Sequence, residues 1–368
     1  MTSRILLVIP TLDRSGAEKQ LVMLARGLPK EEFEVHVCAL TREGPLAAPL
    51  TEAGIPIHSI GKRGKVDPLA FWRLTALMRR LKPDLVHTWI FAANAYGRAA
   101  ALRAGVRVIV GGERCVDPWK SWWEFAIDRP LAKRSECIIT NSSGVREFYS
   151  RHGIAASKFE IIPNGIAMPS CEVKRTKAAW AEELGVPETA HWIGAIGRLW
   201  PQKRYPDLLC GVDVMKVVRD DVYLLILGGG PDRQKLERYA WQLKVEDRVR
   251  FLGERPDVQE LLPHLSISTL ASGYEGQSNA IMESMAWRLP VVASDIPGNR
   301  DLVVEGETGY LFPVGDRGEM ARCWQRILSQ PDLAKRLGDA GAARMREHFS
   351  IEQMVARHAE LYHRLLHR

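Results

Sequence analysis

Three features that would set a chain apart from ordinary globular proteins are missing from these 368 residues. None of the six cysteines forms a CxxC pair, so the spacing favoured by zinc sites is absent and reduced, buried thiols are expected. No apolar run approaches the ~20 residues that a membrane-spanning helix needs. No low-complexity segment occurs. These absences argue against a zinc domain, a membrane-spanning helix and a disordered chain.

The first apolar run, residues 5–9, is also too short to be a secretion signal. It covers five residues and is followed by Pro10, Asp13 and Arg14, whereas the apolar part of a signal peptide has roughly 7–15 residues. The run predicts a buried first strand instead.

Positive charge is in excess and is concentrated in the first half of the chain. The formal net charge is +7; residues 1–175 carry 26 Lys and Arg against 17 Asp and Glu, so their net charge is +9, and the remainder carries −2. An anionic partner or an anionic membrane surface would meet that half first. Nucleic acid is not an expected partner, because no RNA-reading motif accompanies the basic residues.

Short apolar runs alternate with helical periods in two series, which indicates parallel sheets with helical crossovers. A stretch with Pro, Gly and basic residues at 163–189 separates the series. We expect an α/β protein of two Rossmann-like, doubly wound domains facing each other across a cleft: residues 1–168 and 169–350, with the last helix, about 351–368, packing back onto the first domain. The expected strands are 5–9, 33–40, 55–60, 85–87, 106–110, 137–141 and 159–162, then 191–196, 222–227, 249–251, 266–270, 290–293 and 310–312.

Candidate binding residues follow the predicted strands of the second domain, where open α/β sheets bind ligands. Arg198 and Lys203 come after the strand 191–196, and two cations there could hold a diphosphate. Gly229 lies in a Gly-Gly-Gly-Pro turn after the strand 222–227, where backbone can approach a phosphate closely. A solvated basic turn and a plain strand-to-helix turn are the alternatives, of similar weight.

The stretch Tyr-Glu-Gly-Gln-Ser-Asn-Ala-Ile-Met-Glu at 274–283 places one carboxylate in a turn and a second inside a helix. The helix is expected to begin at Ser278 or Asn279, both good N-caps, and its free N–H groups would bind a phosphate. Glu283, within the helix, could accept two ribose hydroxyls, and Glu275 would lie nearer the other substituent of the phosphate. Alternatively, Glu275 and Glu283 are two surface charges. The apolar residues that flank them make this alternative less favoured.

Turns of the first domain allow two interpretations each. Gly16 opens a helix after the first strand and offers backbone donors to an anion. His87 ends the strand 85–87 and could act on a sugar hydroxyl or donate to a phosphate. Arg114 follows the strand 106–110. The alternatives are an ordinary turn for Gly16 and Arg114 and a structural role for His87. They are about as strongly favoured as the functional interpretations.

Several motifs in order resemble the retaining, nucleotide-sugar-dependent glycosyltransferases of family 4 (group 1), which have the GT-B fold. They are Ser-Gly-Ala-Glu at 15–18, Pro-Asp-Leu-Val-His-Thr-Trp at 83–89, Ile-Ile-Pro-Asn-Gly-Ile at 161–166, Gly-Arg-Leu-Trp-Pro-Gln-Lys at 197–203, and the Glu-x7-Glu of 275–283 followed by LPVVASDIPGNRDLVVEGETGYLFP. The resemblance spans nearly the whole chain. It implies that Arg198 and Lys203 neutralise the donor diphosphate, that Glu283 binds the ribose, that Glu275 contacts the transferred sugar, and that Gly16 lies under the phosphates.

The resemblance implies transfer of a hexose-type sugar from a nucleotide-diphosphate donor to a glycan or lipid-linked acceptor, in cell-surface polysaccharide or glycolipid biosynthesis. It implies retention at the anomeric carbon, an orienting role for Glu275 and no metal or other cofactor. The chain departs from the family at Ser15, where a Gly is usual, and at 87–89, where His-x-His is usual. It departs again at Trp287 and Arg288, where a small residue and Gly are usual. These departures leave the sugar open.

Aromatic and basic residues gather in the first domain. Residues 117–125 contain three Trp and one Phe, and a predicted helix at 67–81 has an apolar face framed by Lys and Arg. Trp119, Trp122 and Arg114 are therefore the candidates for the acceptor side. The pattern suits a lipid-linked acceptor or a membrane interface, with a core-facing helix as the alternative. We expect a cytoplasmic enzyme, peripheral on the inner face of the plasma membrane.

Two other functions fit part of this pattern. A sugar-nucleotide epimerase shares the two-domain architecture, but it needs no acceptor and leaves the aromatic surface unexplained. A non-catalytic nucleotide-sugar-binding protein would not need the complete set of Arg198, Lys203, Glu275 and Glu283. Product analysis separates the first from a transferase, because one lengthens a glycan and the other isomerises the donor.

Overall fold

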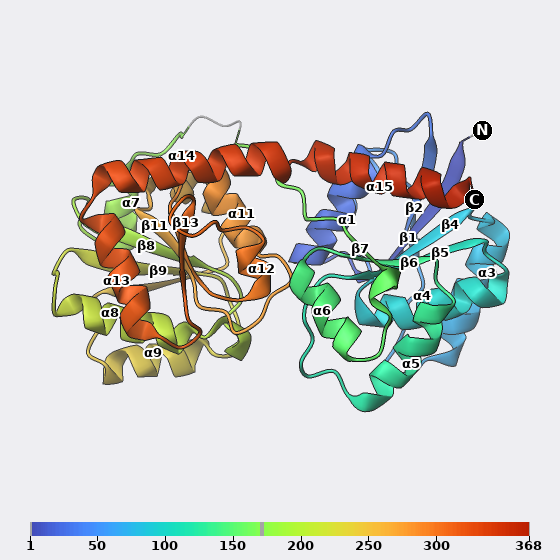
Figure 1. Ribbon diagram of the computed structural model, residues 1–368, viewed down its shortest axis with the longest axis horizontal. Coiled ribbons are helices and arrows are strands. Elements are labelled where there is room, and N and C mark those ends of the chain that lie inside the picture. Colours follow the sequence, from blue (N-terminus) through green and yellow to red (C-terminus); the bar gives the residue numbers. More distant parts are fainter. Residues whose placement is uncertain (1, 170–172, 368) are drawn as a thin grey trace. The chain divides into compact units, whose positions relative to one another are not determined.

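The structure is a computed structural model that describes residues 2–169 and 173–367 (Figure 1). The chain divides into two compact units: unit 1 comprises Met1–Gly165 and Phe349–Arg368, and unit 2 comprises Ile166–His348. Each unit has its own parallel sheet and its own core. The prediction of two doubly wound α/β domains is thereby confirmed.

Unit 1 is built on a seven-stranded parallel sheet in the order β3-β2-β1-β4-β5-β6-β7. Each strand overlaps a predicted one, because strands covered on both faces read as continuous apolar runs. The winding direction reverses between β1 and β4, which pair with each other. The strands are β1 (Ser3–Thr11), β2 (Phe33–Arg42), β3 (Ile57–Ser59), β4 (Leu85–Trp89), β5 (Val108–Glu113), β6 (Cys137–Thr140) and β7 (Phe159–Ile161).

Alternate residues of β1 fill two different halves of the unit 1 core, as the period of two along a strand requires. Ile5 and Leu7 pack in the half that α1 and α15 cover, whereas Leu6 and Val8 pack in the half that α3 and α4 cover. The helices of unit 1 are α1 (Gly16–Gly27), α2 (Ala47–Glu52), α3 (Pro68–Leu81), α4 (Ile90–Ala104), α5 (Trp122–Lys133), α6 (Ser143–Arg151) and α15 (Ile351–Leu366).

Helix α15 comes from the end of the chain and lies along α1 (Figure 1). The two helices approach closely at Gly27, where a Cβ atom would lie 2.6 Å from Cγ2 of Val355. Deeper in the core, the Tyr362 hydroxyl lies 2.7 Å from Nδ1 of His87 on β4, and both side chains are fully buried. This pair ties the last helix to the centre of the sheet.

Unit 2 has a six-stranded parallel sheet in the order β10-β9-β8-β11-β12-β13, with its reversal between β8 and β11. One face packs against α8, α9 and α13, and the other against α7, α10 and their neighbours. The strands are β8 (His191–Ile196), β9 (Val222–Leu227), β10 (Val249–Gly253), β11 (Ile267–Leu270), β12 (Val291–Ser294) and β13 (Gly309–Phe312). The helices are α7 (Lys177–Leu184), α8 (Tyr205–Lys216), α9 (Arg233–Gln242), α10 (Val258–Leu261), α11 (Asn279–Ala286), α12 (Pro297–Arg300), α13 (Arg317–Leu328) and α14 (Pro331–His348).

None of the helices in the described part of the chain combines the length and the apolar character that a bilayer crossing requires.

Replacing Tyr362 by Phe tests how strongly α15 is held. The substitution removes the hydroxyl and leaves Nδ1 of His87 buried without a partner, which should lower the free energy of unfolding of unit 1 by about 1–3 kcal/mol. Tyr362→Ala should cost more, about 3–5 kcal/mol, because a buried ring is lost as well. Urea unfolding measures both. Equal stability of Tyr362→Phe and wild type would show that the hydroxyl contributes nothing.

Candidate functional site

Reversal of the winding direction places a binding site at one position in each sheet. In a doubly wound sheet, ligands bind beyond the carboxyl ends of the two strands that flank the reversal. In unit 2 these strands are β8 and β11. The predicted residues Arg198 and Lys203 follow β8, and Glu275 follows β11. The topology therefore brings the two most informative motifs of the second domain to one edge.

The turns after β8 and β9 are packed directly against each other. The amide of Leu199 donates to the carbonyl of Gly229 at 2.8 Å. At Gly228, which has φ of 142°, a Cβ atom would lie 2.0 Å from the carbonyl oxygen of Gly197. Gly229 itself faces Glu254, whose Oε1 would lie 3.1 Å from a Cβ atom there. The glycines are thus needed for close packing of two turns, and the predicted phosphate contact of Gly229 stays a prediction.

Lys203 and Glu275 form an ion pair at this edge, with Nζ 2.5 Å from Oε1. Both side chains are largely buried, and the same carboxylate oxygen accepts a hydrogen bond from Ser272 Oγ at 2.8 Å. An ammonium group has three donors, so Lys203 can hold Glu275 and still donate to an anion. Arg198 comes from the same turn, is exposed, and lies over the Trp200 ring at 5.7 Å.

The loop that carries Glu275 is fixed at several points. Gln202 Nε2 donates to the carbonyl of Tyr274 at 2.8 Å, and Ser294 Oγ donates to the carbonyl of Ser272 at 2.6 Å. On the far side the loop touches α12, because a Cβ atom at Gly298 would lie 1.9 Å from the carbonyl oxygen of Gly276. The Glu275 carboxylate is therefore held in place before any ligand arrives.

Helix α11 begins as the sequence predicted. Ser278 is its N-cap, with its Oγ accepting from the amide of Ile281 at 3.4 Å, and Asn279 is its first residue. Glu283 lies half-buried on the second turn and accepts from Gln259 Nε2 at 3.3 Å. The helix thus presents N–H groups beside the Glu275 loop, and such a terminus favours negative charge.

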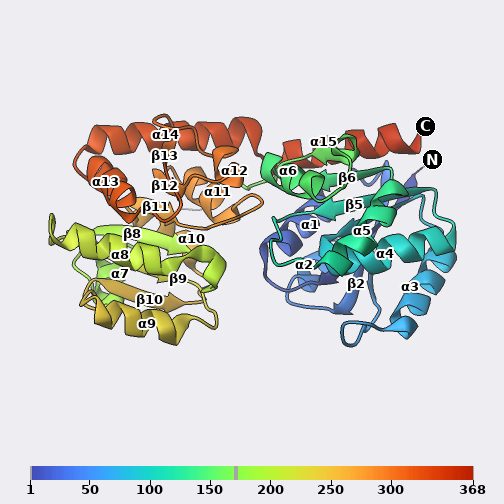
Figure 2. The ribbon, with the colours of Figure 1, turned by 60° about the horizontal axis from the view of Figure 1, so that its bottom comes forward.

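The predicted residues of unit 1 fall into an exposed group and a buried group. Gly16 is exposed and begins α1, after β1. Trp119 and Trp122 are 62% and 81% exposed. Trp119 precedes α5 and Trp122 begins it; α5 lies beside α4, which lies beside α3 (Figure 2). These residues are accessible, and their roles stay predictions.

His87 and Arg114 lie inside unit 1. Burial and the nearby Arg114 and His358 hold the pKa of His87 well below its usual range, so the ring is neutral. Arg114 donates to Asn164 Oδ1 at 2.8 Å and lies over the Trp89 ring at 4.3 Å; burial lowers its pKa to about 9. The structure places His87 in the core of unit 1, and its part in catalysis stays a prediction.

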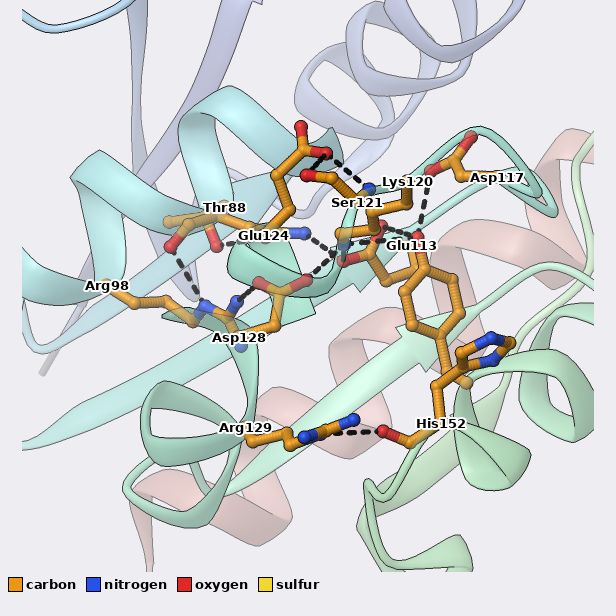
Figure 3. Close-up of polar contacts among 12 residues, drawn as sticks. Thr88, Arg98, Glu113, Asp117, Lys120, Ser121, Glu124, Asp128, Arg129 and His152 are labelled. Carbon is orange, nitrogen blue, oxygen red and sulfur yellow. Dashed lines mark hydrogen bonds and ion pairs between the residues drawn. The ribbon is translucent and has the colours of Figure 1, made fainter. Parts of the chain in front are cut away.

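Sequence reasoning missed a buried network around Lys120, the residue that follows Trp119 in the chain (Figure 3). Lys120 points inward and pairs with Asp128, which also accepts from Arg98 Nη2 at 2.6 Å. Glu113, at the end of β5, accepts from Asn94 Nδ2 at 2.8 Å. The only signal in the sequence was the charge in Gly-Gly-Glu-Arg after a buried strand, since the partners come from three other segments.

Within residues 2–169 and 173–367, no three His, Cys, Asp or Glu side chains are grouped as a metal site requires.

Replacing Gly298 by Ala tests whether the Glu275 loop depends on its contact with α12. The new methyl would meet the carbonyl of Gly276, so we expect a loss of about 1–3 kcal/mol in stability together with faster amide exchange across residues 272–278. Gly338→Ala is the matched control, because its Cβ would lie 1.9 Å from the Arg288 carbonyl instead. It should destabilise unit 2 without loosening that loop. Equal exchange of the loop in both variants would contradict the prediction.

Comparisons with known proteins agree with this geometry. The family model "Glycosyl transferases group 1" matches residues 176–344, and "Glycosyltransferase Family 4" matches residues 14–168. A lipopolysaccharide core biosynthesis glycosyltransferase, LpsE of Rhizobium meliloti, is 28% identical over 285 residues, which is 77% of each chain. The UDP-Gal:alpha-D-GlcNAc-diphosphoundecaprenol alpha-1,3-galactosyltransferase of Escherichia coli is 24% identical over 322 residues, 82% of each chain.

Solved structures show the same fold. Anabaena Alr3699/HepE in complex with UDP superposes with a TM-score of 0.86 and 21% identity, covering 98% of this chain and all of that one. The same protein in complex with UDP-glucose gives a TM-score of 0.85 at 22% identity, covering 98% and 99%. Together the two family models cover the strands β2–β7 and β8–β13 and every motif of the unit 2 edge described above. The chain therefore belongs to the group 1, family 4 glycosyltransferases and has their GT-B fold.

Proposed function

We propose that the enzyme transfers a hexose-type sugar from a nucleotide-diphosphate donor to a glycan or lipid-linked acceptor, in cell-surface polysaccharide or glycolipid biosynthesis. The observation that carries the proposal is the buried Lys203–Glu275 pair beside the N-terminus of α11. A cation, a carboxylate and the N-terminus of a helix at one sheet edge match the parts of a sugar nucleotide. The names of the relatives, which mention lipopolysaccharide core and a diphosphoundecaprenol-linked acceptor, support the acceptor class.

The donor is held in this proposal by charge at unit 2. Arg198 and Lys203 neutralise the diphosphate, with the N-terminus of α11 adding a favourable dipole. The support is that Arg198 is exposed and Lys203 keeps N–H groups to donate. Glu275, fixed by Lys203 and Ser272, orients the transferred sugar. The solved complexes of Alr3699/HepE with UDP and UDP-glucose make UDP the first nucleotide to try.

The chemical step follows from where charge develops. As the nucleoside diphosphate leaves, the sugar acquires oxocarbenium character and the phosphate gains negative charge. Arg198, Lys203 and the helix terminus stabilise the phosphate, so protein cations supply the role that a metal has elsewhere. The acceptor oxygen bonds to the anomeric carbon on the face that the phosphate leaves, its proton passes to the departing phosphate oxygen, and the configuration is retained.

We also propose that unit 1 lies on an anionic membrane surface. Its large exposed apolar side chains belong to α3, to α5 and to the residues just before each of them. Both helices lie beside α4 (Figure 2). Arg103 lies over the Trp72 ring at 5.7 Å, and Lys62, Arg63 and Lys65 precede Val66 in the sequence. Aromatic side chains beside basic residues are typical of membrane interfaces. The exposed apolar residues are Val66, Leu69, Trp72, Trp119, Trp122, Trp123 and Ile127.

Replacing Glu283 by Ala tests the donor site. Without the carboxylate the ribose hydroxyls lose their acceptor, which should weaken nucleotide binding by about 1–3 kcal/mol. Calorimetric titration with UDP, GDP and ADP measures the loss and identifies the base. Glu237→Ala, on the exposed side of α9 in an ion pair with Arg233, is the control and should bind as wild type does. Unchanged affinity of Glu283→Ala would remove Glu283 from the site.

Product analysis with the nucleotide that binds then decides the reaction class. A lengthened glycan with retained configuration, formed equally well in EDTA, is expected. An isomerised donor with no acceptor product would indicate an epimerase instead.

Liposome flotation tests the membrane surface. Trp119→Ala combined with Trp122→Ala should lower the fraction bound to vesicles containing phosphatidylglycerol about tenfold or more, because two exposed rings lose their apolar burial. Trp241→Ala is the matched control, since Trp241 is 69% exposed but belongs to unit 2. Wild-type protein that stays unbound at low salt would refute peripheral binding.

A further inference from the structure

The segment that carries the exposed tryptophans is anchored by a side chain that points the opposite way. Trp119 is exposed, whereas Lys120, the next residue, is buried; Figure 3 shows Lys120 beside Asp128. The Lys120 ammonium pairs with Asp128 and lies 4.6 Å from the centre of the Phe91 ring and 4.7 Å from that of Tyr149. The position of the tryptophans therefore depends on what holds Lys120.

The hydroxyl of Tyr149 has two carboxylate neighbours. Its oxygen lies 3.0 Å from Glu113 Oε2 and 2.8 Å from Asp117 Oδ2. A phenol has one proton, so it can donate to only one of these carboxylates. The other contact is a hydrogen bond only if that carboxyl group carries a proton and donates to the phenol oxygen. The Lys120 ammonium also reaches the phenol oxygen, with Nζ at 3.5 Å, but it does not bridge the two oxygens of the Glu113–Tyr149 contact. The geometry thus points to one additional proton in the group formed by Glu113, Tyr149 and Asp117.

Counting charge leads to the same result. The network contains two buried cations, Arg98 and Lys120, and three carboxyl groups: the buried Asp128 and Glu113 and the half-buried Asp117. With all three ionised the cluster would hold a net negative charge away from water, which is costly. One bound proton makes it neutral.

Glu113 is the group that holds this proton. It is 3% exposed at the end of β5, whereas Asp117 is partly accessible in the segment before α5. Burial, together with Asp128 and Asp117, raises the pKa of Glu113 to about 7 against the opposing effect of Lys120 and Arg98. Burial also raises the pKa of Asp117, which Tyr149 and Lys120 lower and Asp128 and Glu124 raise. Glu113 then donates to Tyr149, and Tyr149 donates to Asp117.

We propose that Glu113 is a positioning residue for the transfer reaction: the proton that it shares with Tyr149 and Asp117 locks the tryptophan segment, Val116–Ser121, in the conformation that engages the acceptor. The lock itself stands on contacts within unit 1. That the segment binds an acceptor rests on the proposed function. Ionisation of Glu113 places a negative charge beside Asp117 and Asp128, and opening of the segment is then favoured because it hydrates that carboxylate.

The direction of the pH effect follows from linkage. The closed segment binds the proton more tightly than an open one, in which the pKa of Glu113 returns to its ordinary value of 4.5. Closing is therefore favoured at low pH, weakens as the pH rises from 4.5 to about 7, and levels off above that. Between pH 6 and pH 8 the opening equilibrium should increase about tenfold.

Amide exchange of residues 114–122, corrected for the intrinsic effect of pH, measures this opening in the intact enzyme. Wild type should lose about tenfold in protection between pH 6 and pH 8. Glu113→Gln keeps a donor to Tyr149 and cannot ionise, so its protection should be independent of pH. Glu147→Gln, on the exposed face of α6 in a pair with Arg151, should behave as wild type does.

The proposal would be overturned if amide protection did not change with pH in wild type. It would also be overturned if protection in Glu113→Gln fell with pH as it does in wild type. Should Glu113→Gln not fold, Asp117→Asn gives a second test. It removes one carboxylate that raises the pKa of Glu113, so the loss of protection should move to lower pH. If Asp117→Asn loses protection at the same pH as wild type, the proposed lock is refuted.

Kinetics link the lock to the reaction. The KM for the acceptor should rise about twofold or more between pH 6 and pH 8 in wild type and should stay constant in Glu113→Gln. The two proteins should have the same kcat at saturating acceptor and the same affinity for UDP. If no sugar transfer is detected, the proposed function is refuted. The lock is then tested by the amide-exchange result alone. If transfer occurs but the acceptor KM has the same pH dependence in wild type and Glu113→Gln, the link between the lock and the reaction is refuted. The lock itself is then still judged by amide exchange.

Discussion

Parallel strands all end on the same edge of their sheet, and in a doubly wound sheet two neighbouring strands diverge there into helices on opposite faces. This constraint places every candidate of unit 2. Residues 72 positions apart, Lys203 and Glu275, meet because β8 and β11 are adjacent at the reversal. The same constraint brings Gly16 after β1 and His87 on β4 to the reversal of unit 1. Function in this fold depends on which side chains follow those strands.

Much of this arrangement could be predicted from local sequence. Strands such as β8 and β9 were predicted at their observed bounds, because strands covered on both faces are uninterrupted apolar runs. The start of α11 was also predictable, since Ser278 is a strong N-cap and capping is local chemistry. The starts of α1 at Gly16 and of α15 at residue 351 were also predicted, because helical periodicity is a local signal.

Pairing between distant side chains could not be predicted. His87 was left open between a catalytic and a structural role, and its partner Tyr362 lies 275 residues away. No periodicity reports such a distance. Lys203 was assigned to a phosphate from its place after a strand, but its salt bridge to Glu275 depends on how far each loop reaches. The roles of the glycines after β9 were equally hidden, because Gly228 is explained by the backbone of Gly197, a contact visible only in three dimensions.

The two units use charge in opposite ways. In unit 2, Arg198 is exposed and Lys203 has donors to spare, so their charge is available to an anion. In unit 1 the charges of Arg98 and Lys120 are buried and already matched by carboxylates. A buried network of this kind is often no more stable than apolar residues of equal volume, so it is better explained by specificity than by stability. Here the specificity is positional: the network fixes Lys120, and a residue fixed on the inside determines where its neighbour Trp119 stands on the outside.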